Sequence, residues 1–315
     1  MKGVKQFILN NKFLHILVLS IYNYGFWYLN KLTNYYFEKK KFKKKLGYKL
    51  NLKHPKSFNE KVVFKKIYDR NPLLTRTADK VAVRDYVKEV LGEKEGEKHL
   101  IPLLYVTNKP KTIPFEKLPK DFVIKANHGS GWNIIVRNGK YNKKEIIKKC
   151  EAWLNTPYGL NKMEWAYKNI PRKIIIEKFL KDKNNQSPKD YKFHMFHGKC
   201  KMIQINQGAF SNKDSRTLTL YNSEWNKIEN VFWEFKSTKK ILKPKNLKEM
   251  INISKKLSKE FDYVKVDLYT LNNKIYVGEL TNYPTSGNPT INPTSFDFEL
   301  GKHWKIKRNY WKRRR

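Results

Sequence analysis

The chain has 315 residues, enough to bury one sizeable core or two modest ones. Its 67 Lys and Arg against 28 Asp and Glu give a net charge of +39, which favours anionic partners such as nucleic acid, lipid surfaces or phosphorylated substrates. Only two cysteines are present, Cys150 and Cys200. They are too few for a disulfide framework or a thiolate metal site, so the composition favours a reducing compartment.

The first 48 residues differ from the rest of the chain. Residues 13–30 carry no formal charge and approach the shortest length of a membrane span, but their tyrosines and tryptophan suit a membrane interface better. The lysine run "KKKFKKK" (39–45) follows the apolar segment. A signal peptide is not expected, because no small-residue cleavage pattern follows the apolar segment. We expect residues 1–48 to form a membrane-associating amphipathic helix and a polybasic linker. A helix packed on the core and a true span are the alternatives.

Helix-like and strand-like segments alternate from residue 49 onward. Ser57 precedes Glu60 by three residues at the start of an apolar helical pattern, which predicts a capping box. Two hairpins are expected, one turning at 197–198 and the other at 272–273. Helices alternating with hairpins predict an α+β fold with antiparallel sheets. The expected helices span 57–69, 77–92 and 246–261, and the expected strands and hairpins span 122–126, 173–180, 189–206 and 264–280.

The segment "FVIKANHGSGWN" (122–133) ends a strand in Lys125 and then enters a glycine-rich loop. A lysine there can reach phosphate oxygens while loop N–H groups cradle them, and Gly129 and Gly131 permit the close approach. An ordinary hairpin turn looks similar, and neither the Walker pattern nor the dinucleotide fingerprint is present. Ser130 has no visible His/Asp partner, so acyl-enzyme chemistry is not expected.

The last hairpin brings two acidic residues together. Across a turn at 272–273, Asp267 faces about residue 278, so Asp267 and Glu279 are neighbours in either register. Adjacent carboxylates repel unless a cation is present, and Mg²⁺ is commonly held by one or two carboxylates plus substrate phosphates. The alternative is that one carboxylate faces solvent or pairs with Lys265.

Glu177 follows three isoleucines and precedes Phe179 and Leu180. An acid at a strand end can bind an adenine amino group beside an apolar wall, and a strand simply entering water is the alternative. His194 and His197 lie in the first hairpin without the Cys/His spacing of a structural zinc site, so ordinary polar positions are expected for them.

The order of these features resembles the ATP-grasp superfamily. The phrases "SFNEK", "ADKVAVRDYV", "FVIKANHGSG", "DYKFHMFHGK" and "GELTNYPTSG" together resemble its TupA-like branch, found among bacterial cell-surface polysaccharide enzymes. The resemblance covers about residues 49–300. It implies an ATP-grasp fold of two α+β lobes with antiparallel sheets gripping ATP between them, with a lid lobe at about 121–180 and a core lobe at about 181–300. Residues 1–48 and a basic tail at 301–315 lie outside it.

The resemblance also implies roles for individual residues. Lysines would bind the nucleotide phosphates, a glycine loop would close over them, and acids would read adenine and ribose. A lysine at 265 would face the reacting intermediate, and the last hairpin would hold Mg²⁺. The implied ATP-binding residues are Lys80, Lys125, His128, Gly129, Ser130, Gly131, Glu177, Phe179, Leu180, Asp190 and Lys192, the catalytic residues are Lys265 and Lys125, and the metal ligands are Asp267, Glu279, Thr281 and Asn282.

Two positions depart from the family pattern. Many relatives read Glu-x-Asn for the last metal ligands, whereas Asn282 here lies one position late and Thr281 takes its place. Either Asn282 reaches in through a bulge or the second metal is held differently. Lys265 stands where many relatives have arginine. A lysine there cannot form the two parallel hydrogen bonds that a guanidinium makes to a carboxylate or phosphate.

The implied reaction is ATP-driven ligation of a carboxylate to an amine through an acyl phosphate. The implied acceptor is a uronic acid or similar carboxylate in capsule, teichuronopeptide or other surface polysaccharide, or its lipid-linked precursor, and the amine an amino acid. The expected location is cytoplasmic, peripheral on the inner face of the bacterial cell membrane. Two alternatives remain. One is a glycosyltransferase or other sugar-modifying enzyme of the same assembly, although no Asp-x-Asp motif is present. The other is a nucleic-acid-binding protein, which core-like aromatic spacing makes unexpected.

Overall fold

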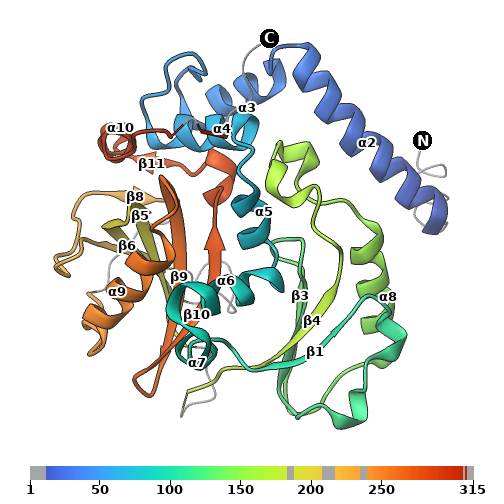
Figure 1. Ribbon diagram of the computed structural model, residues 1–315. Coiled ribbons are helices and arrows are strands. Elements are labelled where there is room, and N and C mark those ends of the chain that lie inside the picture. Colours follow the sequence, from blue (N-terminus) through green and yellow to red (C-terminus); the bar gives the residue numbers. More distant parts are fainter. Residues whose placement is uncertain (1–11, 183–187, 208–216, 235–239, 308, 311–315) are drawn as a thin grey trace.

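Two antiparallel sheets divide the chain into a small lobe and a large lobe (Figure 1). The small lobe has four strands in the order β1-β4-β2-β3, and the large lobe has five in the order β10-β9-β5-β6-β7. The computed structural model describes residues 12–182, 188–207, 217–234, 240–307 and 309–310. The sheets stand on either side of helices α5 and α6 (Figure 1).

The elements have the following bounds. The helices are α2 (Lys12–Leu32), α3 (Tyr36–Leu46), α4 (Phe58–Tyr68), α5 (Pro72–Ala78), α6 (Ala82–Leu91), α7 (Glu93–Lys98), α8 (Lys143–Asn155), α9 (Leu247–Leu257) and α10 (Thr294–Lys302). The strands are β1 (Leu103–Thr107), β2 (Phe122–Ala126), β3 (Asn133–Val136), β4 (Ile174–Lys178), β5 (Asp190–Phe196), β6 (Lys199–Gln207), β7 (Thr217–Tyr221), β8 (Phe232–Trp233), β9 (Tyr263–Leu271), β10 (Lys274–Thr281) and β11 (Ile291–Asn292).

The large sheet buries one face beneath α9. Val264, Val266 and Leu268 alternate along β9 and are fully buried, as expected for one face of a strand. The amphipathic pattern of α9 supplies Met250 and Leu257 to the same core. The other face of β9 therefore carries the polar side chains that form the site described below.

The small lobe has its own core. Phe122 and Ile124 of β2 and Ile176 of β4 are fully buried and pack with Ile146 and Cys150 of α8. Because side chains alternate across a strand, the intervening residues of β2 and β4 face away from α8. That opposite face is the one that carries Lys125 and Glu177.

Several local predictions are confirmed. The segment 122–126 is β2, and both hairpins turn at the expected positions with left-handed backbone at 197–198 and 272–273. Ser57 and Glu60 form the capping box of α4: the Ser57 side chain accepts from the Glu60 N–H, and Glu60 accepts from the Ser57 N–H. These features depend on neighbouring residues alone, so the sequence reveals them.

The single helix expected at 77–92 is wrong, because α5 and α6 are separated by a break at Asp79–Val81. The Asp79 carboxylate accepts hydrogen bonds from the Val81 N–H and the Asn127 side chain, each at 2.8 Å. The Lys80 N–H donates to the Asn127 carbonyl at 3.2 Å. This contact with a distant residue stops the helix and places Lys80 in the break rather than on a helix.

Three other boundaries differ from expectation. The small sheet begins with β1 at Leu103, upstream of the expected start at 121, because β1 pairs with β4. The expected linker at 39–45 is helical and lies in α3, where Phe42 is fully buried. The expected basic tail begins inside the core, since the Trp304 ring lies 4.7 Å from that of Tyr263. Residues 1–11, 308 and 311–315 lie outside the described residues.

The helix α2 runs along the outside of the molecule beside the small lobe (Figure 1). It contacts the body at residues 160–162 and through α3. Among the described residues, no helix combines the length and the apolar character that crossing a bilayer requires.

Candidate active site

The polar face of the large sheet gathers alternating charges. Lys192 on β5 lies opposite Asp267 on β9, and its ammonium donates to the Asp267 carboxylate at 2.7 Å and also to Asp190. Lys265 approaches the same Asp267 oxygen at 3.5 Å. Burial lowers the pKa of Lys192, but the two carboxylates outweigh it and hold that pKa above its ordinary value. Two acids and two lysines therefore lie side by side on one sheet face.

A bulge at Gly278 sets the register of the last hairpin. Val277 pairs with Leu268 and Glu279 pairs with Asp267, so Gly278 is the extra residue. A Cβ atom on Gly278 would lie 2.6 Å from the Tyr269 ring, which leaves room only for glycine. The prediction that Asp267 and Glu279 are neighbours is confirmed, and the bulge at Gly278 sets the register in which they pair.

Unpaired oxygens lie around this hairpin. Asp190 Oδ1, Asp267 Oδ1, Thr281 Oγ1 and Asn282 Oδ1 are buried and have no hydrogen-bond partner within the described part of the chain. Oxygen ligands of this kind suit Mg²⁺, which takes one or two carboxylates and completes its shell with waters and phosphates. No cluster of three or more His, Cys, Asp or Glu residues that could hold a metal occurs in the described residues. The donor set therefore fits a cation shared with a phosphate ligand rather than one held by protein alone.

Asn282 is fixed from the side of α5. Its side-chain N–H₂ donates to the Leu74 carbonyl at 3.1 Å and to the Thr77 hydroxyl at 3.2 Å. Thr281 lies opposite Lys265 in the hairpin, on the same face as the Asp267 and Glu279 pair two residues away. The register therefore favours Thr281 over Asn282 as a neighbour of the two carboxylates, and their roles as ligands stay predictions.

The small lobe contributes a cation and an acid to the opposite side. Lys125 on β2 donates to Glu177 on β4 at 2.6 Å, and Arg84 on α6 approaches the other Glu177 oxygen at 3.4 Å. Arg84 also donates to the Ile101 carbonyl at 2.9 Å, so it joins the two lobes. No role is predicted for Arg84 from the sequence, although an arginine on the buried face of a helix is a recognisable signal.

Lys80 connects the two halves. Its ammonium donates to the Gly129 carbonyl in the glycine loop. Burial lowers the pKa of Lys80 and the Lys125 ammonium lowers it further, while the carboxylates of Glu279 and Glu177 raise it. Charged groups of both lobes therefore act on this one lysine.

The glycine loop is held from beneath. His128 is buried, and its ring nitrogens contact the Asn127 side chain at 3.2 Å and the Trp153 carbonyl at 3.1 Å. A Cβ atom on Gly129 would lie 2.9 Å from the Trp132 ring, and Gly131 has φ +77°. Burial lowers the pKa of His128 to about 4, so the ring is neutral. The side chain of His128 thus supports the loop, and Ser130 and Gly131 are the exposed residues at its tip.

The remaining predicted residues lie at the edge of the small lobe. Phe179 is buried under the guanidinium of Arg137, 4.4 Å from its ring centre, and Leu180 is half-buried.

His194, expected as an ordinary hairpin residue, is fully buried between Gln204 and Tyr263. Asn127 lies in the glycine-rich segment 122–133, although no role was predicted for it, and it links the break before α6 and the glycine loop to the start of β4.

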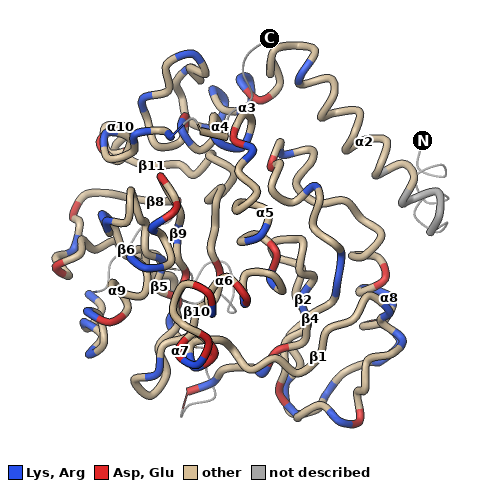
Figure 2. Tube along the Cα trace, in the orientation of Figure 1, with Lys and Arg blue, Asp and Glu red and all other residues tan. Residues whose placement is uncertain are grey.

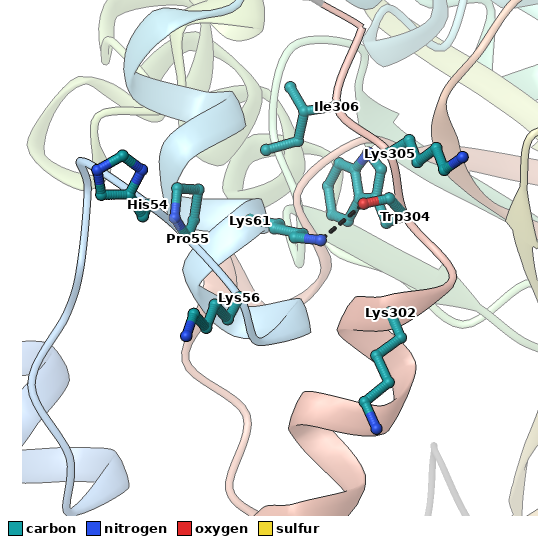
Figure 3. A pocket seen from close by; sticks show the side chains of 8 residues that line it. All are labelled: His54, Pro55, Lys56, Lys61, Lys302, Trp304, Lys305 and Ile306. Carbon is teal, nitrogen blue, oxygen red and sulfur yellow. Dashed lines mark hydrogen bonds between the residues drawn. The ribbon is translucent and has the colours of Figure 1, made fainter.

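A separate basic cavity lies away from these residues, between the start of α4 and the end of α10 (Figure 3). Its volume is about 370 Å³. Lys61 points across it and donates to the carbonyls of Gly301 and Trp304 at 2.7 Å each (Figure 3). Lys61 therefore binds the last turn of α10. The lining residues are His54, Pro55, Lys56, Lys61, Lys302, Trp304, Lys305 and Ile306, none of which is a predicted site residue.

Comparison with known proteins identifies the family to which the chain belongs. No curated protein is significantly similar to the chain in sequence. Among solved structures, a D-alanine–D-alanine ligase from Bacillus anthracis in complex with ATP is 20% identical, with 66% of this chain and 55% of that one covered and a TM-score of 0.38. The corresponding ligase from Helicobacter pylori is 15% identical, with 78% and 69% covered and a TM-score of 0.42. An N5-carboxyaminoimidazole ribonucleotide synthetase in its ADP complex is 13% identical, with 67% and 46% covered and a TM-score of 0.42.

The chain spans little more than half the length of the Bacillus anthracis ligase. The family model described as TupA-like ATPgrasp matches residues 60–305, which includes both sheets and every predicted site residue. The two-lobed α+β architecture with antiparallel sheets is the ATP-grasp fold, and the chain belongs to the TupA-like ATP-grasp family.

Proposed function

We propose that the protein is an ATP-dependent carboxylate–amine ligase. The observation that carries the proposal is the convergence of Lys80, Lys125 and Glu177 with Asp267 and Glu279 between two antiparallel sheets. Family membership supports it, because the TupA-like ATPgrasp model matches residues 60–305, the part of the chain that contains all five residues. Residues of both charge signs occur along the strands of the two sheets (Figure 2).

The residues divide into nucleotide and reaction groups. Lys80 and Lys125 carry positive charge to the phosphate chain, and the N–H groups of Gly129 and Gly131 line its cover. Glu177, held by Lys125 and Arg84, is placed to accept from the adenine amino group. This assignment requires Lys125 to exchange its Glu177 contact for phosphate when nucleotide binds.

The reacting groups are supplied by the large lobe. Mg²⁺ bound at Asp267 and Glu279 would neutralise charge on the transferred phosphoryl group. Lys265 orients the substrate carboxylate, whose oxygen attacks the γ-phosphorus as the bond to the β,γ-bridging oxygen breaks and ADP leaves. The amine nitrogen then attacks the acyl carbon, phosphate leaves, and the nitrogen loses a proton to give the amide. Closure of the loop 128–131 excludes water, which would otherwise hydrolyse the acyl phosphate.

The acceptor we propose is a uronic acid or similar carboxylate in capsule, teichuronopeptide or another surface polysaccharide, or in its lipid-linked precursor. The amine is proposed to be an amino acid. The basic surroundings support an anionic acceptor, since the chain carries a net charge of +39. The polysaccharide class of the acceptor is inferred from the resemblance to the TupA-like branch.

The experiment is a screen of uronic-acid glycans against amino acids with Mg·ATP, read by product mass and ADP release. The full chain is compared with Lys125→Ala and with Lys120→Ala, an exposed lysine just before β2 that serves as the matched control. We expect an amide product formed with one ADP, lost in Lys125→Ala and kept in Lys120→Ala. Equal ADP release by both variants would contradict the assignment of Lys125.

A further inference from the structure

Helix α2 exposes a row of large apolar side chains. In the described residues, 13 large hydrophobic side chains are exposed, and nine of them lie between Leu17 and Tyr36. At 3.6 residues per turn, the eight within α2 fall in an arc of about 160°. This apolar face consists of Leu17, Val18, Ile21, Tyr22, Tyr24, Tyr28, Leu29 and Leu32.

The opposite side of α2 faces the protein, and there two buried asparagines lie beside the half-buried rings of Phe26 and Trp27. Asn23 is 6% exposed and Asn30 is fully buried. The Asn30 side-chain oxygen accepts from the Glu38 N–H at 3.2 Å. A surface helix in water normally buries its large apolar side chains, whereas α2 leaves the eight of its apolar face exposed. An exposed apolar face of this kind is typical of a surface that is covered by a lipid layer or another apolar surface.

The apolar face is fixed to the catalytic lobes. Glu38 at the start of α3 forms a buried ion pair with Lys66 of α4 at 2.6 Å. Lys66 also donates to the Ser286 carbonyl at 2.9 Å, in the turn that follows β10 and its metal-site acid. Trp27 of α2 lies beneath the ammonium groups of Lys31 and Lys168, 3.6 and 5.0 Å from its ring centre. The helix is therefore packed on the body along one side and bare along the other.

Positive charge accompanies the apolar face. Figure 2 shows α2 almost without charged residues along its described length and α3 rich in lysine. Exposed aromatic residues beside exposed lysines suit an anionic lipid surface, because the rings enter the headgroup region and the ammonium groups meet the lipid phosphates. A second copy of the chain fits poorly, since each copy carries a net charge of +39. The exposed lysines of α3 are Lys40, Lys41, Lys43, Lys44 and Lys45.

We propose that α2 and α3 bind the protein to an anionic bilayer surface, with the apolar face of α2 in the headgroup region and the α3 lysines against the lipid phosphates. The binding needs neither ATP nor an acceptor, so it stands apart from the proposed ligase activity. Because α3 is joined to Lys66 and Ser286, docking holds the turn after β10 at a fixed height above the lipid.

The test is co-sedimentation of the full chain with vesicles of phosphatidylcholine, with and without phosphatidylglycerol. Ile21→Gln with Leu29→Gln removes apolar surface from positions that are 63% and 44% exposed, so folding should be unaffected. Leu242→Gln is the matched control, because Leu242 is 87% exposed on a distant loop. Lys43→Gln with Lys44→Gln tests the charge. Circular dichroism and thermal melting confirm that each variant is folded.

We expect strong binding only to vesicles that contain phosphatidylglycerol. The partition coefficient should fall about tenfold or more in each double variant and stay unchanged in Leu242→Gln. No binding by the parent would overturn the proposal. So would equal binding by the Ile21/Leu29 variant, which would reduce the interaction to charge alone. A lipid-free dimer in light scattering that this variant disrupts would assign the face to a second copy and equally overturn the proposal.

Discussion

Replacing Lys192 by methionine tests the charge arrangement on the large sheet. Lys192 lies between Asp190 and Asp267, and its side chain is 12% exposed while those of the acids are 18% and 6% exposed. Removing one partner of a buried ion pair costs about 3–5 kcal/mol, because the remaining charges are left uncompensated. Since these groups keep some contact with solvent, we take the lower end, about 3 kcal/mol of unfolding free energy. For a chain of this size that corresponds to a melting temperature lower by about 5 °C.

The loss should depend on pH in a defined direction. Burial raises the pKa of Asp190, the Asp267 charge raises it further, and the Lys192 ammonium opposes both. The pKa of Asp190 is already above its ordinary value in the parent, and loss of Lys192 raises it further. An acid whose pKa is raised by folding destabilises the fold as pH rises through its unfolded pKa towards the folded one. The variant should therefore be closest to the parent near pH 4 and furthest from it at pH 7.

The assay is thermal unfolding across that pH range. Lys201→Met is the matched control, because Lys201 is an exposed lysine on the neighbouring strand β6. We expect a pH-dependent deficit in Lys192→Met and almost none in Lys201→Met. Identical melting temperatures for the two variants at pH 7 would refute the buried charge arrangement.

Three further predictions follow from the same residues. Gly278→Ala forces a Cβ atom against the Tyr269 ring, 2.6 Å away, so we expect a loss of about 1–3 kcal/mol in urea unfolding together with lost ADP formation; a stable, active variant would contradict the role of the bulge. Burial lowers the pKa of Lys80 below the ordinary lysine value of 10.5, so Lys80 should lose its proton at a lower pH. ATP affinity measured by calorimetry should therefore fall as pH rises through that lowered pKa. Lys80→Met should bind ATP weakly and without this pH dependence. Burial lowers the pKa of His194 from 6.5 to about 3, so unfolding free energy should fall as pH drops below 6.5, when the unfolded chain gains a proton that the folded chain refuses; an unchanged acid slope in His194→Gln would refute this.

The sequence was most informative where function depends on local pairing. A turn at 272–273 was enough to place Asp267 beside Glu279, because antiparallel pairing follows directly from the turn. The bulge at Gly278 was not visible, because it reflects the bulk of Tyr269 across the hairpin. A pattern along one strand carries no information about a ring on the next strand.

Contacts between distant segments account for the other failures. The break that places Lys80 depends on Asn127, nearly fifty residues later in the chain. The lysine-rich sequence of α3 predicts a charged linker, because only two of its side chains, Phe42 and Glu38, are buried in the fold. The partner that neutralises Glu38 is Lys66 on α4. Trp304 lies in a basic tail by composition, yet it packs against Tyr263. In each case a tertiary partner reverses the preference of the local sequence.

We propose that phosphoryl transfer from ATP at the Asp267 and Glu279 hairpin drives amide formation. The most direct measurement compares ADP and amide formation by the full chain, Glu279→Gln, and the control Glu299→Gln on the exposed side of α10. We predict equal amounts of ADP and amide in the parent and the control, and a loss of about 100-fold or more in Glu279→Gln with an unchanged melting temperature. Amide formation without ATP consumption, or parental ADP formation by Glu279→Gln, would contradict the account.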